Sequence, residues 1–219
     1  YSITVTITDI EDNSLSKDLT LTITDANDAP TSVSITGGSA AENSSGASFG
    51  TLSTADPDAV DTFTYAVTGG TDAASFEVGS SNTLKFKSTV SGNFETKSSY
   101  TVIVTSTDSG SASTSSTLTL SLTDVNESPT DIALSGGSAA ENLAGASFGT
   151  LSTTDPDASD SFTYSVTGGT DAASFEIGTS NVLKFKSTVA GNFESKSSYS
   201  VIVTSTDAGS NTYAETLTV

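Results

Sequence analysis

The nine residues Tyr100-Thr-Val-Ile-Val-Thr-Ser-Thr-Asp108 carry the pattern that decides the fold. Tyr100, Val102 and Val104 occupy alternate positions, which is typical of a β-strand with one buried face. Closely similar segments stand at 1–9 and 199–207, 99 residues away on either side. The chain is therefore repetitive, and the same strand type recurs in each repeat.

The repeat extends well beyond this strand. Across positions 31–110, 62 of 80 residues are identical to the residue 99 positions further on. We expect residues 1–24 to be the C-terminal tail of a truncated preceding repeat and residues 25–123 to be one repeat. Residues 124–219 form a second repeat that lacks its end, so we expect the chain to be a segment of a longer array.

Within each repeat the apolar residues alternate with polar ones over short segments. Residues 63–67, 84–86 and 118–122 show this period of two, and Gly-rich turns separate the segments. No stretch of ten or more residues shows the 3.6-residue apolar period of a helix. The pattern predicts an all-β chain of tandem seven-stranded Greek-key β-sandwiches linked end to end.

The composition excludes several classes of function. The 26 acidic and 7 basic residues give a formal charge of −19, which would repel nucleic acids and anionic membranes. The chain has neither cysteine nor histidine, so thiolate or imidazole metal ligands and a Ser-His-Asp triad are excluded. No apolar run approaches the length of a membrane-spanning helix, so no direct membrane insertion is expected. The acids are then either a solubilising coat or a set of oxygen-ligand sites for a hard cation.

The positions of the acids favour cation sites. Most of the repeated acids fall in loops, and successive loops of a sandwich alternate between its two ends. Acids at the C-terminal end of one repeat, in the linker and at the N-terminal end of the next would then converge. Such like charges repel unless a cation neutralises them, and calcium takes about 6–8 oxygen ligands.

Five sequence elements resemble the calcium motifs of the cadherin family, specifically the cadherin-like repeats of large bacterial surface proteins. They are Ala-Glu-Asn at 41–43, Asp-Pro-Asp at 56–58, Asn-Phe-Glu at 93–95, Ser-Thr-Asp at 106–108 and Asp-Val-Asn-Glu-Ser-Pro at 124–129. One such element alone is a common turn. Five in order, duplicated at a fixed interval, are specific. The resemblance implies a cadherin-like, immunoglobulin-like sandwich in each repeat.

The resemblance also implies calcium ligands at the linkers. Glu42 would bridge ions with Glu95 beside it, Asn126 would supply a side-chain oxygen, and Asp207 would close the innermost site. The implied set at the complete junction is Glu42, Glu95, Asp124, Asn126, Glu127, Asp155, Asp157 and Asp207. At the first junction it is Asp25, Asn27, Asp28, Asp56, Asp58 and Asp108.

The sequence departs from the family pattern in places. Asn93 stands where an acid is common, Glu127 replaces the usual linker Asp, and Ser128 replaces Asn. We therefore expect two calcium ions at the complete junction and a weakened third site. The chain has no tryptophan, so the adhesive exchange of classical cadherins is not expected. Four other repeated acids match no ligand motif and are interpreted as turn or cap residues: Asp61, Asp72, Asp160 and Asp171.

The predicted function is that of a calcium-binding repeat module of an extracellular or cell-surface protein, with no enzymatic activity of its own. Calcium would stiffen the linkers, either for cell adhesion or in a rigid stalk. The expected partners are calcium and like repeats on another molecule (homophilic adhesion) or a cell-surface ligand. An alternative hypothesis makes the repeats spacers in a large secreted enzyme or carbohydrate-binding protein.

Overall fold

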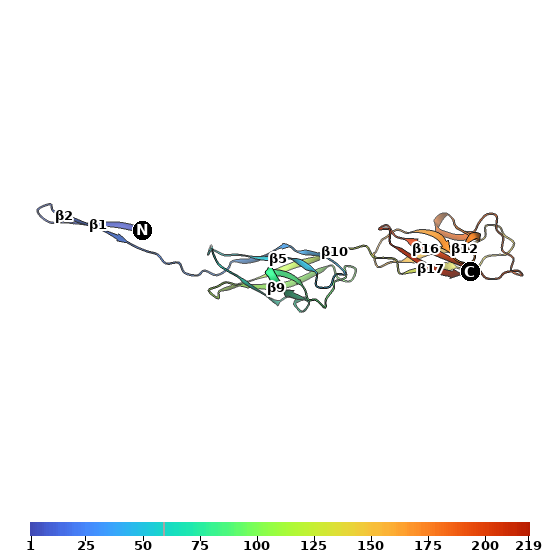
Figure 1. The fold of residues 1–219 in the computed structure, drawn as a ribbon, viewed down its shortest axis with the longest axis horizontal. Coiled ribbons are helices and arrows are strands. Elements are labelled where there is room, and N and C mark those ends of the chain that lie inside the picture. Colours follow the sequence, from blue (N-terminus) through green and yellow to red (C-terminus); the bar gives the residue numbers. More distant parts are fainter. Residues whose placement is uncertain (59) are drawn as a thin grey trace. The chain divides into compact units, whose positions relative to one another are not determined.

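The computed structural model describes residues 1–58 and 60–219, and strands dominate this part of the chain (Figure 1). The strands of the N-terminal hairpin are β1 (Ser2–Thr8) and β2 (Ser14–Thr20). Those of the first repeat are β3 (Ser32–Gly37), β4 (Ser39–Ala41), β5 (Ser48–Ala55), β6 (Thr64–Gly69), β7 (Phe76–Val78), β8 (Thr83–Phe86), β9 (Ser99–Thr107) and β10 (Ser113–Thr123). Those of the second repeat are β11 (Asp131–Gly136), β12 (Ser147–Thr154), β13 (Thr163–Gly168), β14 (Phe175–Ile177), β15 (Val182–Phe185), β16 (Ser200–Thr206) and β17 (Thr212–Thr218).

Short 3-10 turns provide the helical structure in the described residues. They are η1 (Ala73–Ser75), η2 (Ser80–Asn82), η3 (Ala172–Ser174) and η4 (Thr179–Asn181). No helix in the described part of the chain combines the length and the apolar character that crossing a membrane requires.

Each repeat forms a sandwich of two sheets, so the predicted all-β sandwich class is confirmed. The sheets of the first repeat have the orders β3-β5-β8-β7 and β4-β10-β9-β6, and those of the second repeat have the orders β11-β12-β15-β14 and β13-β16-β17. The pairings whose register is described are antiparallel, such as β16 with β17. Among the described residues the second repeat has the predicted seven strands, whereas the first has eight.

The eighth strand, β4, begins where the chain changes sheets at Gly37 and Gly38. Strand β3 belongs to one sheet and β4 to the other, and the two glycines between them have φ angles of +108° and +94°. A Cβ atom on Gly37 would lie 2.7 Å from the Phe49 carbonyl oxygen, so only glycine fits this crossing. Strand β4 pairs with β10, whose last residue, Thr123, accepts a hydrogen bond from the Glu42 N–H at 3.2 Å. This pairing holds the Glu42 loop beside the start of the linker.

The chain divides into two compact units. The first comprises residues 1–39, 46–90 and 100–120, and the second comprises 40–45, 91–99 and 121–219. The second unit therefore contains the loops around Glu42 and Glu95, the linker and the whole second sandwich. The repeat boundaries 1–24, 25–123 and 124–219 remain a prediction from the sequence.

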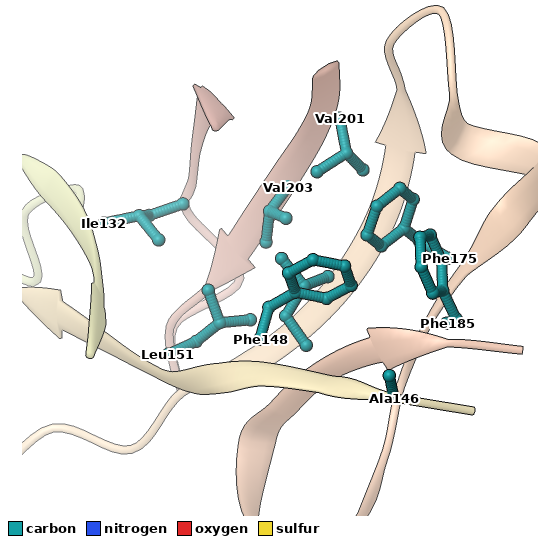
Figure 2. Packing of buried hydrophobic residues seen from close by; sticks show 9 residues of the cluster. Ile132, Ala146, Phe148, Leu151, Phe175, Phe185, Val201 and Val203 are labelled. Carbon is teal, nitrogen blue, oxygen red and sulfur yellow. The ribbon is translucent and has the colours of Figure 1, made fainter. Parts of the chain in front are cut away.

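The core of the second sandwich is built from alternating residues of facing strands (Figure 2). Phe148 and Phe185 meet edge to face with ring centroids 4.8 Å apart, and Phe175 lies 4.9 Å from Phe185. Val201 and Val203 of β16 have no exposed surface and pack against this cluster. The period-two pattern of the sequence thus becomes the buried face of β16, and the strand's position is fixed by packing.

A buried hydroxyl network joins the two sheets close to the end of β16. Thr153 Oγ1 lies 2.8 Å from Tyr164 Oη and 2.7 Å from Ser205 Oγ, and Ser205 is fully buried. The first repeat has the equivalent contacts among Thr54, Tyr65 and Ser106. Buried hydroxyls that satisfy one another add directional restraint to the core. This restraint lies two residues before the acid that ends each strand.

The N-terminal hairpin has one apolar face. The register places Ile3 opposite Leu19 and Ile7 opposite Leu15. These apolar residues are 40–67% exposed, whereas Val102 of β9 and Val201 of β16, at the position of Ile3 in the two repeats, are fully buried. The hairpin has the strand pattern predicted for residues 1–24.

Candidate metal centre

Two turns of the second repeat present their acids to the same end of the sandwich. Asp207 follows β16, and its Oδ1 accepts the Asn211 N–H at 2.7 Å across the turn into β17. In the Asp-Pro-Asp turn, Asp155 Oδ1 accepts the Asp157 N–H at 3.0 Å. Each turn is closed by its own carboxylate, a common use of Asp in tight turns. One oxygen of each acid is consumed in this way, and the other is left for a different partner.

The linker runs over these turns. The Glu127 N–H donates to Asp157 Oδ2 at 2.8 Å, and Asn126 Nδ2 donates to Asp207 Oδ2 at 2.8 Å. Asp207 is only 5% exposed, so its charge is held in a largely dry position. The linker is therefore bound to the second sandwich by the same acids that the sequence singled out.

Glu42 connects the other side of the linker. Its Oε1 accepts the Val125 N–H at 3.0 Å, and its Oε2 accepts the Phe94 N–H at 2.6 Å. The residue is 3% exposed, which is rare for a glutamate without a cationic partner. Within the second unit, one carboxylate thus ties together the loop at 91–99 and the linker.

The acids gather into two clusters in the second unit. In each cluster, one carboxylate oxygen per residue lies within 4.8 Å of those of the others. The first cluster, here called the linker cluster, consists of Glu42, Glu95, Asp124 and Glu127. The second, the turn cluster, consists of Asp155, Asp160 and Asp207, and its copy in the first repeat consists of Asp56, Asp61 and Asp108.

The packing of like charges shifts the acidities within these clusters. Burial raises the pKa of Glu127 to about 6, and the nearby charge of Glu42 acts in the same direction. Burial also raises the pKa of Asp124, reinforced by the carboxylates of Asp157 and Glu42. The pKa of Asp155 is raised by burial, although the Asp157 N–H partly offsets it. All three shifts mean that the ionised clusters lack compensating positive charge.

Several carboxylate oxygens in the clusters and in the neighbouring Asp157 are buried without a hydrogen-bond partner among the described residues. One oxygen of each of six acids is in this position: Asp56, Asp61, Glu127, Asp155, Asp157 and Asp160. Buried polar atoms in folded proteins are nearly always paired, so six orphans at two equivalent places need an explanation. Three lysines lie elsewhere, with Lys85, Lys184 and Lys196 paired to Glu77, Glu176 and Asp171.

The first junction repeats two of the linker contacts of the second. Asn27 Nδ2 donates to Asp108 Oδ2 at 3.1 Å, and the Asp28 N–H donates to Asp58 Oδ2 at 2.8 Å. Asp25 lines a surface hollow together with Asn27 and Asp58. The predicted residues of this junction thus lie together within the first unit.

The structure brings most of the predicted residues of the complete junction together. Four form the linker cluster and two belong to the turn cluster, while Asp157 and Asn126 contact the linker or the turn by hydrogen bonds. The Asn126 contact uses its amide nitrogen. Asn93 stands where the cadherin pattern often has an acid, and its Oδ1 accepts the Thr96 N–H at 2.7 Å within its own turn.

Two cluster members, Asp61 and Asp160, were interpreted from sequence only as turn or cap residues. Asp160 Oδ1 does accept the Ser161 N–H at 2.7 Å, but its other oxygen is buried, unpaired and part of the turn cluster. The signal in the sequence was their fixed position, five residues after Asp56 and Asp155. That interval indicates a place in the turn cluster only once the structure shows that the loop returns toward β16.

The other two acids interpreted as turn or cap residues lie outside the clusters. Asp72 and Asp171 precede η1 and η3 at the cap position, but neither side chain caps its turn. Asp72 Oδ2 accepts the Thr101 N–H at 2.8 Å, and Asp171 Oδ2 accepts the Ser200 N–H at 2.8 Å. The hydrogen bond from Lys196 lowers the pKa of Asp171. These acids fasten the η turns to the neighbouring strands.

Comparison with solved structures identifies the architecture. No family model matches the sequence, and no curated protein matches it. The extracellular domain of protocadherin GammaB4 superimposes with a TM-score of 0.67 at 24% identity, over 100% of this chain and 37% of that one. The fold is cadherin-like.

Two other cadherin structures agree with this cadherin-like fold. Mouse cadherin-23 EC22-24 matches with a TM-score of 0.61 at 18% identity, over 100% of this chain and 72% of that one. The human desmocollin-1 ectodomain matches with a TM-score of 0.60 at 19% identity, over 97% of this chain and 46% of that one. The chain thus spans less than half the length of two of these three structures.

Proposed function

We propose that the chain binds calcium through the acids at its linkers and that calcium fixes each linker to the repeats it joins. The observation that carries this proposal is the set of buried, unpaired carboxylate oxygens in the clusters. A cation would give these oxygens the partner that the described protein groups do not supply. Because all the candidate ligands are oxygens, the donor set suits a hard cation such as calcium better than a transition metal.

The residues present fit such an ion in number and type. The linker cluster offers carboxylates from the Glu42 and Glu95 loops and from the linker, while the turn cluster offers acids of the second repeat. Calcium accepts about 6–8 oxygens in flexible geometry, including backbone and amide carbonyls. We assign the proposed ligands to the residues predicted from sequence, with Asp61 and Asp160 added.

The consequence for the molecule is mechanical. Without a cation, the like charges around the linker repel, and burial together with this repulsion raises the pKa values of Glu127 and Asp124. With calcium, the same groups would hold the linker on both sides. We propose that the repeats serve as an extracellular stalk or spacer with calcium-dependent stiffness, as part of an adhesive surface protein.

A sugar-binding surface has less support. In the described part of the chain, the exposed aromatic residues are Tyr1 and Phe193, and they lie in different units. Sugar stacking uses a cluster of such rings, so the structure favours the stalk over the carbohydrate-binding alternative. The charged clusters contain no histidine or cysteine, and we propose no catalytic role for them.

Calcium titration of a charge-neutral variant tests the proposal. Asp157→Asn keeps an acceptor for the Glu127 N–H but removes the charge, and we expect calcium affinity at this junction to fall by roughly tenfold or more. Isothermal titration calorimetry measures the change. Asp131→Asn, which alters an exposed acid outside the clusters, is the matched control and should bind as the wild type does.

X-ray scattering and calorimetric melting then test the stiffening. Saturating calcium should raise the melting temperature and narrow the range of conformations, since an ion that binds the folded state stabilises it by mass action. The gain is about 2.7 kcal/mol when free calcium is 100 times Kd. Identical scattering curves in calcium and in chelator would contradict the mechanical role even if calcium binds.

A further inference from the structure

The two linkers of this chain are held differently by the sandwich that follows each of them. Both have the sequence Asp-x-Asn-(Asp/Glu)-x-Pro. In both, the Asn side chain donates to the acid that follows a strand of the next sandwich, which is Asp108 after β9 and Asp207 after β16. At the position after that hairpin turn, the first repeat has Ala112 and the second has Asn211. This substitution changes what the turn offers to the linker.

Asn211 holds the linker backbone directly. Its Nδ2 donates to the Asn126 carbonyl oxygen at 3.2 Å and to the Glu127 carbonyl oxygen at 3.0 Å. Its own backbone N–H is bound by Asp207 Oδ1 at 2.7 Å, so the side chain projects from a fixed point. Ala112 has no side-chain donor, although its N–H binds Asp108 Oδ1 in the same way at 2.8 Å.

A shared glycine brings the linker close enough for this contact. A Cβ atom on Gly209 would lie 2.5 Å from Asn126 Cγ, and one on Gly110 would lie 2.1 Å from Asn27 Oδ1. Real Cβ atoms do not approach that closely, so a side chain at either position would displace the Asn amide from its place against the turn. Since the glycine is common to both repeats, Asn211 is what distinguishes the contact of the second sandwich with its linker.

We propose that Asn211 is a positioning residue that fixes linker residues 124–127 against the second sandwich before calcium arrives. Resting on the calcium function proposed above, the inference is that Asn211 raises the calcium affinity of its own junction. A linker that Asn211 already holds by hydrogen bonds loses less conformational freedom when an ion binds, because part of that freedom is already lost. Asn211 therefore increases the calcium affinity of the junction at 124–129 and the order of its linker without calcium.

Reciprocal substitutions test this assignment. Asn211→Ala should weaken calcium binding at the second junction by roughly three- to tenfold, the range for the loss of one or two hydrogen bonds. Ala112→Asn should strengthen the first junction by a similar factor. Chemical-shift titration of the Glu127 and Asp28 amides measures each junction separately in the full chain.

Backbone relaxation in chelator provides the readout that separates positioning from a general effect on folding. In the calcium-free wild type, the amides of Asn126 and Glu127 should be more rigid than those of Asn27 and Asp28. Asn211→Ala should reduce that difference, and Ala112→Asn should make the amides of Asn27 and Asp28 more rigid. A wild-type chain with equally mobile linkers, or an Asn211→Ala variant that weakens both junctions alike, overturns the proposal. If no calcium binds at either junction, the proposed function fails, but the relaxation data still decide whether Asn211 orders the linker.

Discussion

The loops around Glu42 and Glu141 have the same Ala-Glu-Asn sequence but differ in structure. Glu42 is 3% exposed and accepts N–H bonds from Phe94 and Val125, whereas Glu141 is exposed and accepts the Phe193 N–H at 3.0 Å. Residues 121–125 lie along the Glu42 loop, and Thr123 binds the Glu42 N–H and the Ala40 carbonyl. The 219 residues contain no counterpart of this segment for Glu141.

The difference teaches that the motif does not bury its own acid. The Glu141 loop instead borders an open hollow with Phe193, Tyr199 and Val219. At the first repeat, the end of β10 and the linker fill the equivalent place. The linker therefore encloses the candidate site. Its own acids also raise the free-energy cost of ionising the carboxyl groups there.

The largest effect is expected from removing the apolar anchor of the segment that covers Glu42. Leu122 is 4% exposed, so Leu122→Ala should lower the free energy of unfolding by about 2–5 kcal/mol through lost burial and a cavity. Chemical denaturation measures this loss. Leu143→Ala, at a position that is 56% exposed, should change stability by less than about 0.5 kcal/mol. Equal losses in the two variants would show that the segment does not anchor the loop.

The next effect compares the two glutamates themselves. Glu42→Gln should weaken calcium binding by roughly tenfold or more, about 1.4 kcal/mol, because it removes one charge from the linker cluster. Glu141→Gln should leave the affinity unchanged, since Glu141 belongs to neither cluster in the second unit. Calorimetric titration of both variants decides the matter. An equal change of calcium affinity in the two variants would contradict the difference between Glu42 and Glu141.

The smallest effect is a pH dependence of the calcium-free protein. The pKa of Glu127 is raised from 4.5 to about 6 in the folded state, so between these values the folded chain binds more protons than the unfolded one. Calcium-free stability should therefore rise as the pH falls from 7 to about 4.5. Thermal melts in chelator between these pH values measure the trend.

Glu127→Gln is the control for that titration. The substitution keeps the size of the side chain and removes the titrating group. The variant should be more stable than the wild type at pH 7 in chelator and should show a weaker pH dependence. A wild-type melting temperature that falls steadily from pH 7 to 4.5 would contradict the raised pKa.

The sequence by itself determined the repeat, the strands and the kind of ligand. Alternation of apolar residues is local, so the segment at 100–108 predicted strand β9 and its buried valines without knowledge of its neighbours. The absence of cysteine and histidine left only oxygen ligands. The motif order placed Glu42, Glu95 and the linker at a common junction, and the structure brings them together.

Only the tertiary structure decided which acids are buried, paired or orphaned. Asp160 joined the turn cluster because its loop folds back toward Asp207, and nothing in the local pattern distinguishes it from a turn residue. The pairing of β4 with β10 and the hydrogen bonds from Asn211 to the linker likewise join segments separated by roughly 80 or more residues. Such contacts are set by the packing of whole sheets, and the burial and charge of a side chain follow from that packing.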